Sequence, residues 1–211
     1  MLRSLLFAVL ATVGSSGLPL YAQGMMAPDV LAKSVTDEVI VILRSDKDIN
    51  AGNPGKLMKL IETKVLPHFN FTRMTRLAMG KNWRKANPQQ RGGLVEQFRT
   101  LLVRTYATAF GSYRDQTITY RPLRIRPEDD DVVVKSQVVQ PGRPPVAVDY
   151  SMEKTGNGWK VYDVAIEGVS LVQNYRSTFN GEVQRAGIDG LIKALDSKNR
   201  QLAQRTQGAN P

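Results

Sequence analysis

Few side chains in this sequence of 211 residues could perform covalent chemistry. It contains no cysteine and a single histidine, His68. A thiolate nucleophile, a Cys-ligated zinc site and a His-rich metal site are therefore excluded. The motifs HExxH, GxSxG and GxxxxGK[ST] are also absent, so metalloprotease, α/β-hydrolase and P-loop chemistry find no support. We expect His68 to be an ordinary solvated or hydrogen-bonded histidine.

Two acidic features remain as candidates for a site. The carboxylate run Glu128–Asp131 lacks the alternating ligand spacing and the distal glutamate of a calcium loop, so we interpret it as a solvated turn. Asp163 lies inside the apolar pattern VYDV, where a carboxylate costs free energy unless it is paired. Asp163 is either a general base whose pKa is raised by burial or a structural group that binds Arg or backbone N–H groups. We favour the structural interpretation.

The first 22 residues have the layout of a secretory signal peptide. Arg3 precedes an apolar run from Leu5 to Val13, and small residues then lead to Ala22. This run is too short to span a bilayer. We therefore expect residues 1–22 to be removed, and the mature protein to be soluble and located outside the cytoplasm.

The chain is basic, with a formal net charge of +10. Loss of the leader removes only Arg3, which leaves 28 basic against 19 acidic residues, a net charge of +9. Such a surface favours nucleic acid, acidic lipid headgroups or acidic protein patches, and export argues against nucleic acid. A charge excess that serves solubility alone is the alternative.

Basic residues gather around Trp83. Arg76, Lys81, Arg84 and Lys85 lie within one window of the sequence. They form either a charged face with Trp83 as a core anchor or a docking patch for anionic lipid or a partner protein. The two interpretations differ in whether neutralising the charges ends the capture of a partner.

Helices are predicted for the N-terminal half. Pro28 opens a helix with the apolar stripe Leu31, Val35, Val39 and Ile42, and the polar segment 45–55 reads as a loop. Further helices are expected at 56–66, 69–80 and 88–113.

Strands follow, and the chain ends in helices. Alternating or solidly apolar runs predict strands at 117–126, 131–139, 145–154 and 159–166, with a bulge or edge at Pro122 and a tight turn at Gly156–Gly158. Short connections imply an antiparallel sheet. Ser170 can cap a helix that Gly187 closes, and Asp189 can cap another. We expect one α+β domain over residues 23–204 and a disordered tail over 205–211.

Two separated motifs carry a family resemblance. VYDVAIEGVSLVQNYRSTF at 161–179, followed by GIDGLIKAL at 187–195, and FNFTRMTRLAMGKNWRKANPQQ at 69–90 resemble the MlaC family of periplasmic phospholipid-binding proteins, also known as toluene-tolerance auxiliary proteins. The resemblance implies a curved four-stranded sheet of the nuclear-transport-factor-like cone type, with a helical subdomain. A lipid cavity would lie between the sheet and the helices.

The resemblance also implies a function and partners. The protein would carry diacyl phospholipid between the outer and inner membranes, without a cofactor or a metal. Its partners would be an outer-membrane lipoprotein–porin complex and an inner-membrane ABC transporter with an MCE-domain subunit. The expected lining of the cavity is apolar and aromatic: Tyr106, Phe110, Val134, Val138, Val148, Tyr150, Met152, Leu171 and Tyr175.

Two other classes of function stay open. A cone-shaped pocket with Asp163 as base would be an enzyme, and an apolar cleft that holds peptide would be a periplasmic interaction or chaperone-like protein. The identity of the bound material separates these classes from the carrier.

Overall fold

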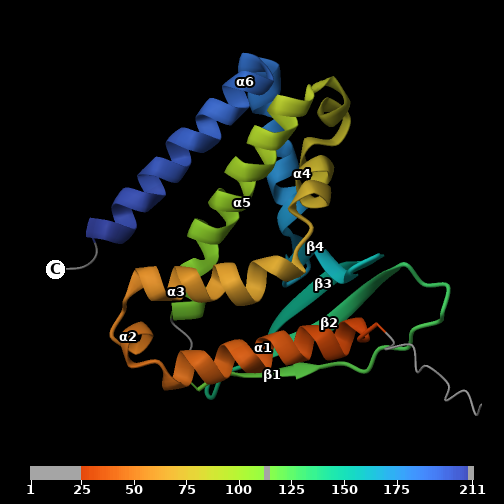
Figure 1. Ribbon diagram of the computed structural model, residues 1–211, viewed down its shortest axis with the longest axis vertical. Coiled ribbons are helices and arrows are strands. Elements are labelled where there is room, and N and C mark those ends of the chain that lie inside the picture. Colours follow the sequence, from red (N-terminus) through yellow and green to blue (C-terminus); the bar gives the residue numbers. More distant parts are fainter. Residues whose placement is uncertain (1–24, 112–114, 209–211) are drawn as a thin grey trace, which may run out of the picture.

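The structure, a computed structural model, describes residues 25–111 and 115–208. It is an α+β fold in which one sheet is packed with helices from both ends of the chain, as the sequence predicts (Figure 1). Residues 1–22, where a signal peptide is expected, lie outside the described part. No helix among the described residues is long and apolar enough to cross a membrane.

The sheet is antiparallel and open, with five strands rather than the expected four. In the order β1-β2-β3-β4-β5, each strand pairs with the next along the chain. The additional strand contains two residues and pairs with β4 through a turn at Glu167 and Gly168, both of which have positive φ. The strands are β1 (Thr117–Tyr120), β2 (Asp131–Val139), β3 (Val146–Thr155), β4 (Gly158–Ile166) and β5 (Val169–Ser170).

Two irregularities of the sheet differ from expectation. β1 ends at Tyr120 rather than near 126, because Pro122 has no N–H to donate and pairing stops after Arg121 N donates to Lys135 O at 2.9 Å. The bulge lies instead between β3 and β4, where Ser151 pairs with Asp163 and Met152 with Val161, so that Tyr162 of β4 is the extra residue. The predicted turn between β3 and β4 is confirmed, since Thr155 pairs with Gly158.

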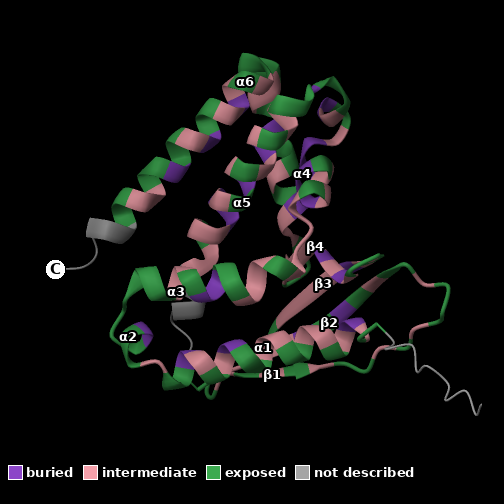
Figure 2. Ribbon diagram, viewed as in Figure 1, coloured by how far each residue is buried: buried purple, intermediate pink, exposed green. Residues whose placement is uncertain are grey.

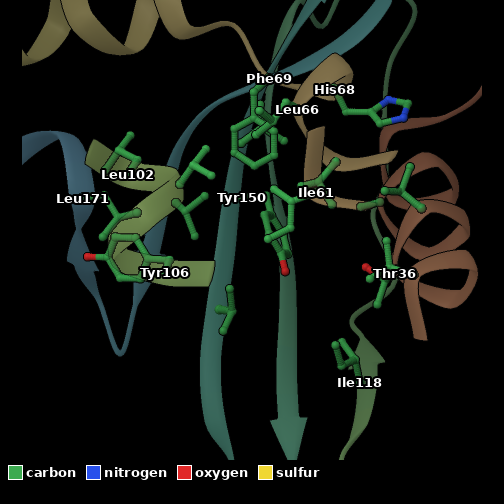
Figure 3. A pocket seen from close by; sticks show the side chains of 18 of the residues that line it. Thr36, Ile61, Leu66, His68, Phe69, Leu102, Tyr106, Ile118, Tyr150 and Leu171 are labelled. Atoms are coloured by element: carbon green, nitrogen blue, oxygen red, sulfur yellow. The ribbon is translucent and has the colours of Figure 1, made fainter. Parts of the chain in front are cut away.

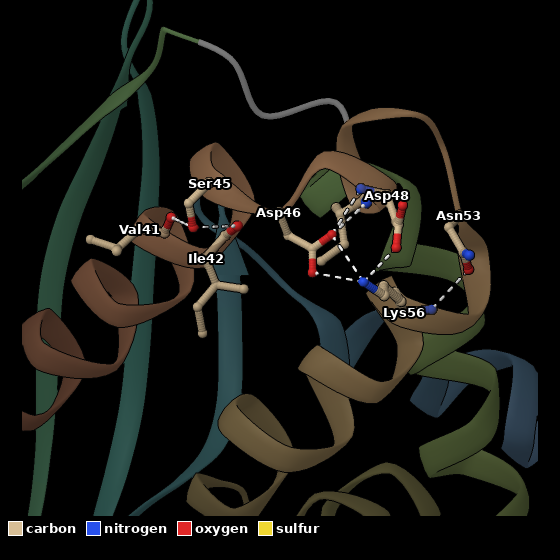
Figure 4. A network of polar contacts seen from close by, with 8 residues as sticks. Val41, Ile42, Ser45, Asp46, Asp48, Asn53 and Lys56 are labelled. Atoms are coloured by element: carbon tan, nitrogen blue, oxygen red, sulfur yellow. Dashed lines mark hydrogen bonds and ion pairs between the residues drawn. The ribbon is translucent and has the colours of Figure 1, made fainter.

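The N-terminal helices include one that the sequence pattern had assigned to a loop. The helical elements of this half are α1 (Pro28–Ser45), α2 (Lys47–Asn50), α3 (Pro54–Leu60), the π-helix η1 (Ile61–Val65), the 3-10 helix η2 (Leu66–His68), α4 (Phe71–Met79), the 3-10 helix η3 (Gly80–Lys85) and α5 (Pro88–Gly111). The Asp46 side chain caps α2 by accepting from the N–H groups of Asp48 and Ile49. Lys56 Nζ binds the Asp46 and Asp48 carboxylates at 3.3 and 2.5 Å (Figure 4).

The last helix, α6 (Leu171–Gly208), is two helices joined at Gly187. Gly187 has φ 72° and ψ −177°, which confirms the predicted break and suits a residue without Cβ. Just after it the backbone passes so close that a Cβ on Gly190 would lie 2.3 Å from the Ala186 Cβ. Residues 205–208 are helical, whereas a disordered tail was expected there.

Buried residues form separate clusters in the helical end and beneath the sheet (Figure 2). In the helical end, Phe98 of α5 meets Tyr175 and Phe179 of α6 with ring centroids 5.1 and 5.0 Å apart. Beneath the sheet, Val134, Met152, Trp159 and Val161 pack together. The helical end therefore has a core of its own, and Phe69 packs against both this core and the cluster beneath the sheet.

Arg73 links the helices to the sheet. Its guanidinium binds Glu153 of β3 at 2.7 Å and Asp131 of β2 at 2.8 Å, and it lies over the Tyr162 ring at 3.6 Å. Asn70, which caps α4, also donates to Glu153 at 2.6 Å. These contacts fix the start of α4 against one end of the strands.

Candidate functional site

A pocket of about 420 Å³ lies between the sheet and the helices, within the range of roughly 300–1,000 Å³ found for ligand sites. α1 covers it from one side, η1 and η2 line one end, and α5 contributes Leu102, Val103 and Tyr106 (Figure 3). The floor comes from the inward positions of the sheet, which are Ile118, Val138, Val148, Tyr150, Met152, Val161, Val164 and Ile166.

The lining is almost entirely hydrocarbon. Among the described residues that line it, only five carry a side-chain nitrogen or oxygen, and none is Asp, Glu, Lys or Arg: Thr36, His68, Tyr106, Gln116 and Tyr150. Thr36 Oγ1 is 2.7 Å from Tyr120 Oη, so that hydroxyl is already satisfied. Burial raises the pKa of the Tyr150 hydroxyl, with a smaller opposing effect from Ser136, and burial also raises the pKa of Tyr106. Both phenols stay neutral, which suits an apolar guest.

Six of the nine residues expected to line a cavity do line this pocket: Tyr106, Val138, Val148, Tyr150, Met152 and Leu171. Val134 does not, because it is fully buried beneath the sheet against Met152 and Trp159. Tyr175 packs in the helical cluster against Phe98. The Phe110 side chain lies outside the part of α5 whose side chains the structure describes.

The largest omission from the expected lining is α1. Leu31, Val35 and Val39 of the predicted stripe line the pocket, together with Leu43 rather than the expected Ile42. The apolar stripe of this helix is visible in the sequence, but its position over the sheet is not, because α1 and the strands are separated by most of the helical half. Only tertiary structure shows that the stripe covers a pocket rather than a solid core.

The π-helix η1 also contributes lining residues. Ile61 and Val65 of η1 line the pocket, as does Leu66, the first residue of η2. This fits the widened turn of a π-helix, where positions four and five residues apart share a side. Pro67 follows in η2 and has no N–H to continue the ladder. π-Helical turns recur at functional sites, although no residue pattern distinguishes this one from an ordinary helix.

Asp163 does not line the pocket, and its carboxylate is occupied by structural contacts. One oxygen accepts from Val164 N at 2.9 Å and Val172 N at 3.1 Å, and the other accepts from Ser170 Oγ at 2.5 Å. Ser170 Oγ in turn accepts from Gln173 N at 3.0 Å. Asp163 and Ser170 therefore cap α6 together, as the structural interpretation expects.

Asp163→Asn should destabilise the protein by about 1–3 kcal/mol, because an NH₂ group replaces one acceptor oxygen of the cap. Urea unfolding measures the loss. Asp149→Asn is the control: it changes a carboxylate of the neighbouring strand for which the described residues provide no hydrogen bond, and should alter stability by less than about 0.5 kcal/mol. Unchanged stability in Asp163→Asn would contradict the capping role.

The four basic residues near Trp83 are exposed at the helical end, away from the pocket (Figures 1 and 2). Arg76 lies on α4, and Lys81, Arg84 and Lys85 lie on η3. Trp83 packs against the helical cluster, and the guanidinium of Arg91 lies 5.3 Å from its ring centroid. This partial burial of Trp83 is compatible with both interpretations of the basic residues.

The acidic run is held by arginines. Asp129 binds Arg126 at 2.9 Å, which lowers the pKa of the Asp129 carboxyl, and Asp131 binds Arg73. Within the described ranges, no group of three acidic, His or Cys side chains could hold a metal ion.

The fold and the pocket define the class of small α+β proteins with an apolar pocket between a sheet and its helices. The chain belongs to the MlaC protein family, whose model matches residues 33–197. It is 26% identical over 198 residues to the toluene tolerance protein ttg2D of Pseudomonas putida, covering 92% of this chain and 90% of that protein.

Two further relatives carry descriptions of lipid binding. The intermembrane phospholipid transport system binding protein MlaC of Haemophilus influenzae is 22% identical over 172 residues, with 80% of each chain covered. A solved structure from Ralstonia solanacearum is a phospholipid-binding protein in complex with a phospholipid. It superposes with a TM-score of 0.77 at 41% identity and covers 83% of this chain and 98% of its own.

Proposed function

We propose that this protein is a phospholipid carrier that binds the acyl tails of a diacyl lipid in the pocket beneath α1 and performs no covalent chemistry. The observation that carries this proposal is the hydrocarbon lining of a pocket that the protein's own side chains leave open. The lipid-bound relative of the same fold supports it. Among the residues that line the pocket, none is a carboxylate that could act as a general base.

Burial of the tails supplies the binding free energy. Each CH₂ group withdrawn from water contributes about 0.8 kcal/mol, so two ordinary tails represent some tens of kcal/mol before the costs of binding. A free phospholipid therefore crosses water too slowly to be useful. A dry pocket that travels with the lipid removes this barrier.

The site of action that we propose is the periplasm of a Gram-negative envelope, reached after removal of residues 1–22. There the protein would move lipid between an outer-membrane lipoprotein–porin complex and an inner-membrane ABC transporter with an MCE-domain subunit. Arg76, Lys81, Arg84 and Lys85 are the residues that we propose for docking, since they are exposed and lie away from the pocket. The net charge of +9 that remains after removal of residues 1–22 supports an anionic partner.

Extraction of the natively purified protein, followed by mass spectrometry, tests the carrier function. We expect about one diacyl phospholipid per protein, released by denaturation, and uptake of phospholipid from vesicles by the delipidated protein. Absence of phospholipid both in the purified material and after incubation with vesicles would reject the proposal. Peptide in place of lipid would favour a chaperone-like role.

A further inference from the structure

His68 is the one pocket-lining residue, among those described, whose side chain can carry a positive charge. It lies at the end of the pocket formed by η2 and is half-exposed, so it is accessible to solvent as well as lining the pocket. A phospholipid brings one charged group that must remain near water, its phosphate. The position of His68 therefore indicates which end of the pocket suits the phosphate.

The chain around His68 places a second cation beside it. Phe69 forms a parallel bridge with Val161 of β4, and Asn70 N donates to Val161 O at 2.8 Å. This pairing holds the segment against the start of β4. Lys160, the residue before Val161, thereby donates from Nζ to Pro67 O at 2.6 Å.

The charge of Lys160 has no anionic partner in the described part of the chain. Its hydrogen-bond acceptor, the Pro67 carbonyl, is neutral. Glu153 is opposite Lys160 in the register of β3 and β4, but its carboxylate binds Arg73 and Asn70 instead. A buried or half-buried cation of this kind is a ready partner for an anion.

The other charges near His68 cancel. From η1, Lys64 Nζ binds Glu38 Oε1 of α1 at 2.6 Å. Burial lowers the pKa of the His68 imidazole, and Lys160 lowers it further, while Glu38 raises it. The imidazole is therefore neutral near pH 7 when no anion is present, and this end of the pocket carries the net charge of Lys160 alone.

We propose that the phosphate of a bound phospholipid lies at this end of the pocket, between the His68 imidazole and the Lys160 ammonium. This inference rests on the carrier function proposed above and specifies its headgroup subsite. A phosphodiester carries one negative charge, which matches the one uncompensated cation. The tails then extend toward Tyr106 and Leu171, which lie across the pocket from His68 (Figure 3).

The proposal has a defined pH dependence. A bound phosphate raises the pKa of His68, so the complex binds a proton more readily than the free protein does. Phospholipid binding should therefore strengthen as the pH falls, until the pH is below the lowered pKa of His68 in the free protein. The charged groups that surround His68 are Lys160, Lys64 and Glu38.

The test compares two guests that share their tails. Delipidated protein is titrated with dioleoylphosphatidylglycerol and with dioleoylglycerol, which lacks the phosphate, and binding is followed by native mass spectrometry. His68→Gln and Lys160→Met should each weaken binding of the phospholipid at least about ten-fold, the loss of a charge-assisted contact, and leave that of the diacylglycerol unchanged. The strengthening at lower pH should be absent in His68→Gln.

Two control variants complete the design. Lys193→Met removes the same charge from an exposed position on α6 and should change neither affinity. Tyr106→Phe removes a hydroxyl from the opposite side of the pocket and should leave the preference for the phosphate intact. Loss of that preference in Tyr106→Phe would overturn the assignment.

Two other results would also overturn it. If His68→Gln and Lys160→Met weaken the binding of the phospholipid and of the diacylglycerol equally, these residues only shape the pocket. If the two substitutions weaken the binding of neither lipid, the phosphate lies elsewhere. If the unmodified protein takes up neither lipid, the carrier function itself fails, which is a distinct outcome because diacylglycerol uptake needs no headgroup subsite.

Discussion

Replacing Val138 with Trp should reduce the phospholipid that copurifies with the protein at least about ten-fold, because the indole occupies space that the tails would fill. Val138 is an inward position of β2 that lines the pocket. The lipid-to-protein ratio is measured by extraction and mass spectrometry. Overpacking costs about 1–3 kcal/mol, so thermal unfolding must show that the variant remains folded.

Val133→Trp provides the matched control. Val133 lies on the same strand but on the opposite face of the sheet, where it is 43% exposed. The same substitution there adds the same volume outside the pocket, and the lipid content should not change. If Val138→Trp folds and retains a full complement of lipid, the tails do not lie in this pocket. Val148→Phe, from the adjacent strand, offers a smaller obstruction should Val138→Trp fail to fold.

Phe98→Ala should cause the largest loss of stability, about 3–5 kcal/mol, which corresponds to about 6–20 °C in Tm for a protein of this size. The Phe98 ring is fully buried and meets two aromatic rings of α6 edge to face. Its removal leaves a cavity between α5 and α6 and ends both ring contacts. Chemical and thermal unfolding measure the effect.

Tyr175→Phe is the control for that cluster, since it retains the ring against Phe98 and removes only a hydroxyl that hydrogen-bonds Thr105. Its cost should be about 0.5–1.5 kcal/mol. Because neither Phe98 nor Tyr175 lines the pocket, both folded variants should still bind lipid. A loss below about 1 kcal/mol in Phe98→Ala would contradict the packing of this cluster.

The order and type of most elements could be predicted from local patterns. The Gly187 break, the tight turn before β4 and the α6 cap at Ser170 each depend on residues within a few positions of one another. Strand β5 escaped prediction because two residues cannot display an alternating pattern. Helix α2 escaped prediction because the four residues that follow the capping Asp46 resemble a polar loop.

The site was less predictable than the fold, for a physical reason. Inward strand positions such as Val138 and Val148 follow from alternation, and both line the pocket. Val134 obeys the same alternation but is covered by its neighbours. The alternating pattern alone therefore cannot distinguish a residue that lines the pocket from one that fills the core. The contributions of α1 and His68 depend on how distant segments pack, which no local pattern contains.

The pocket lining runs from Leu31 near one end of the chain to Leu171 near the start of the last helix, so only the fully assembled fold possesses it. A lipid that binds there would have no counterpart site in the denatured chain. By mass action, the free energy of unfolding would then rise with the concentration of free lipid. Cargo and conformational stability would be thermodynamically linked, and a carrier that has delivered its lipid would be the form most susceptible to proteolysis.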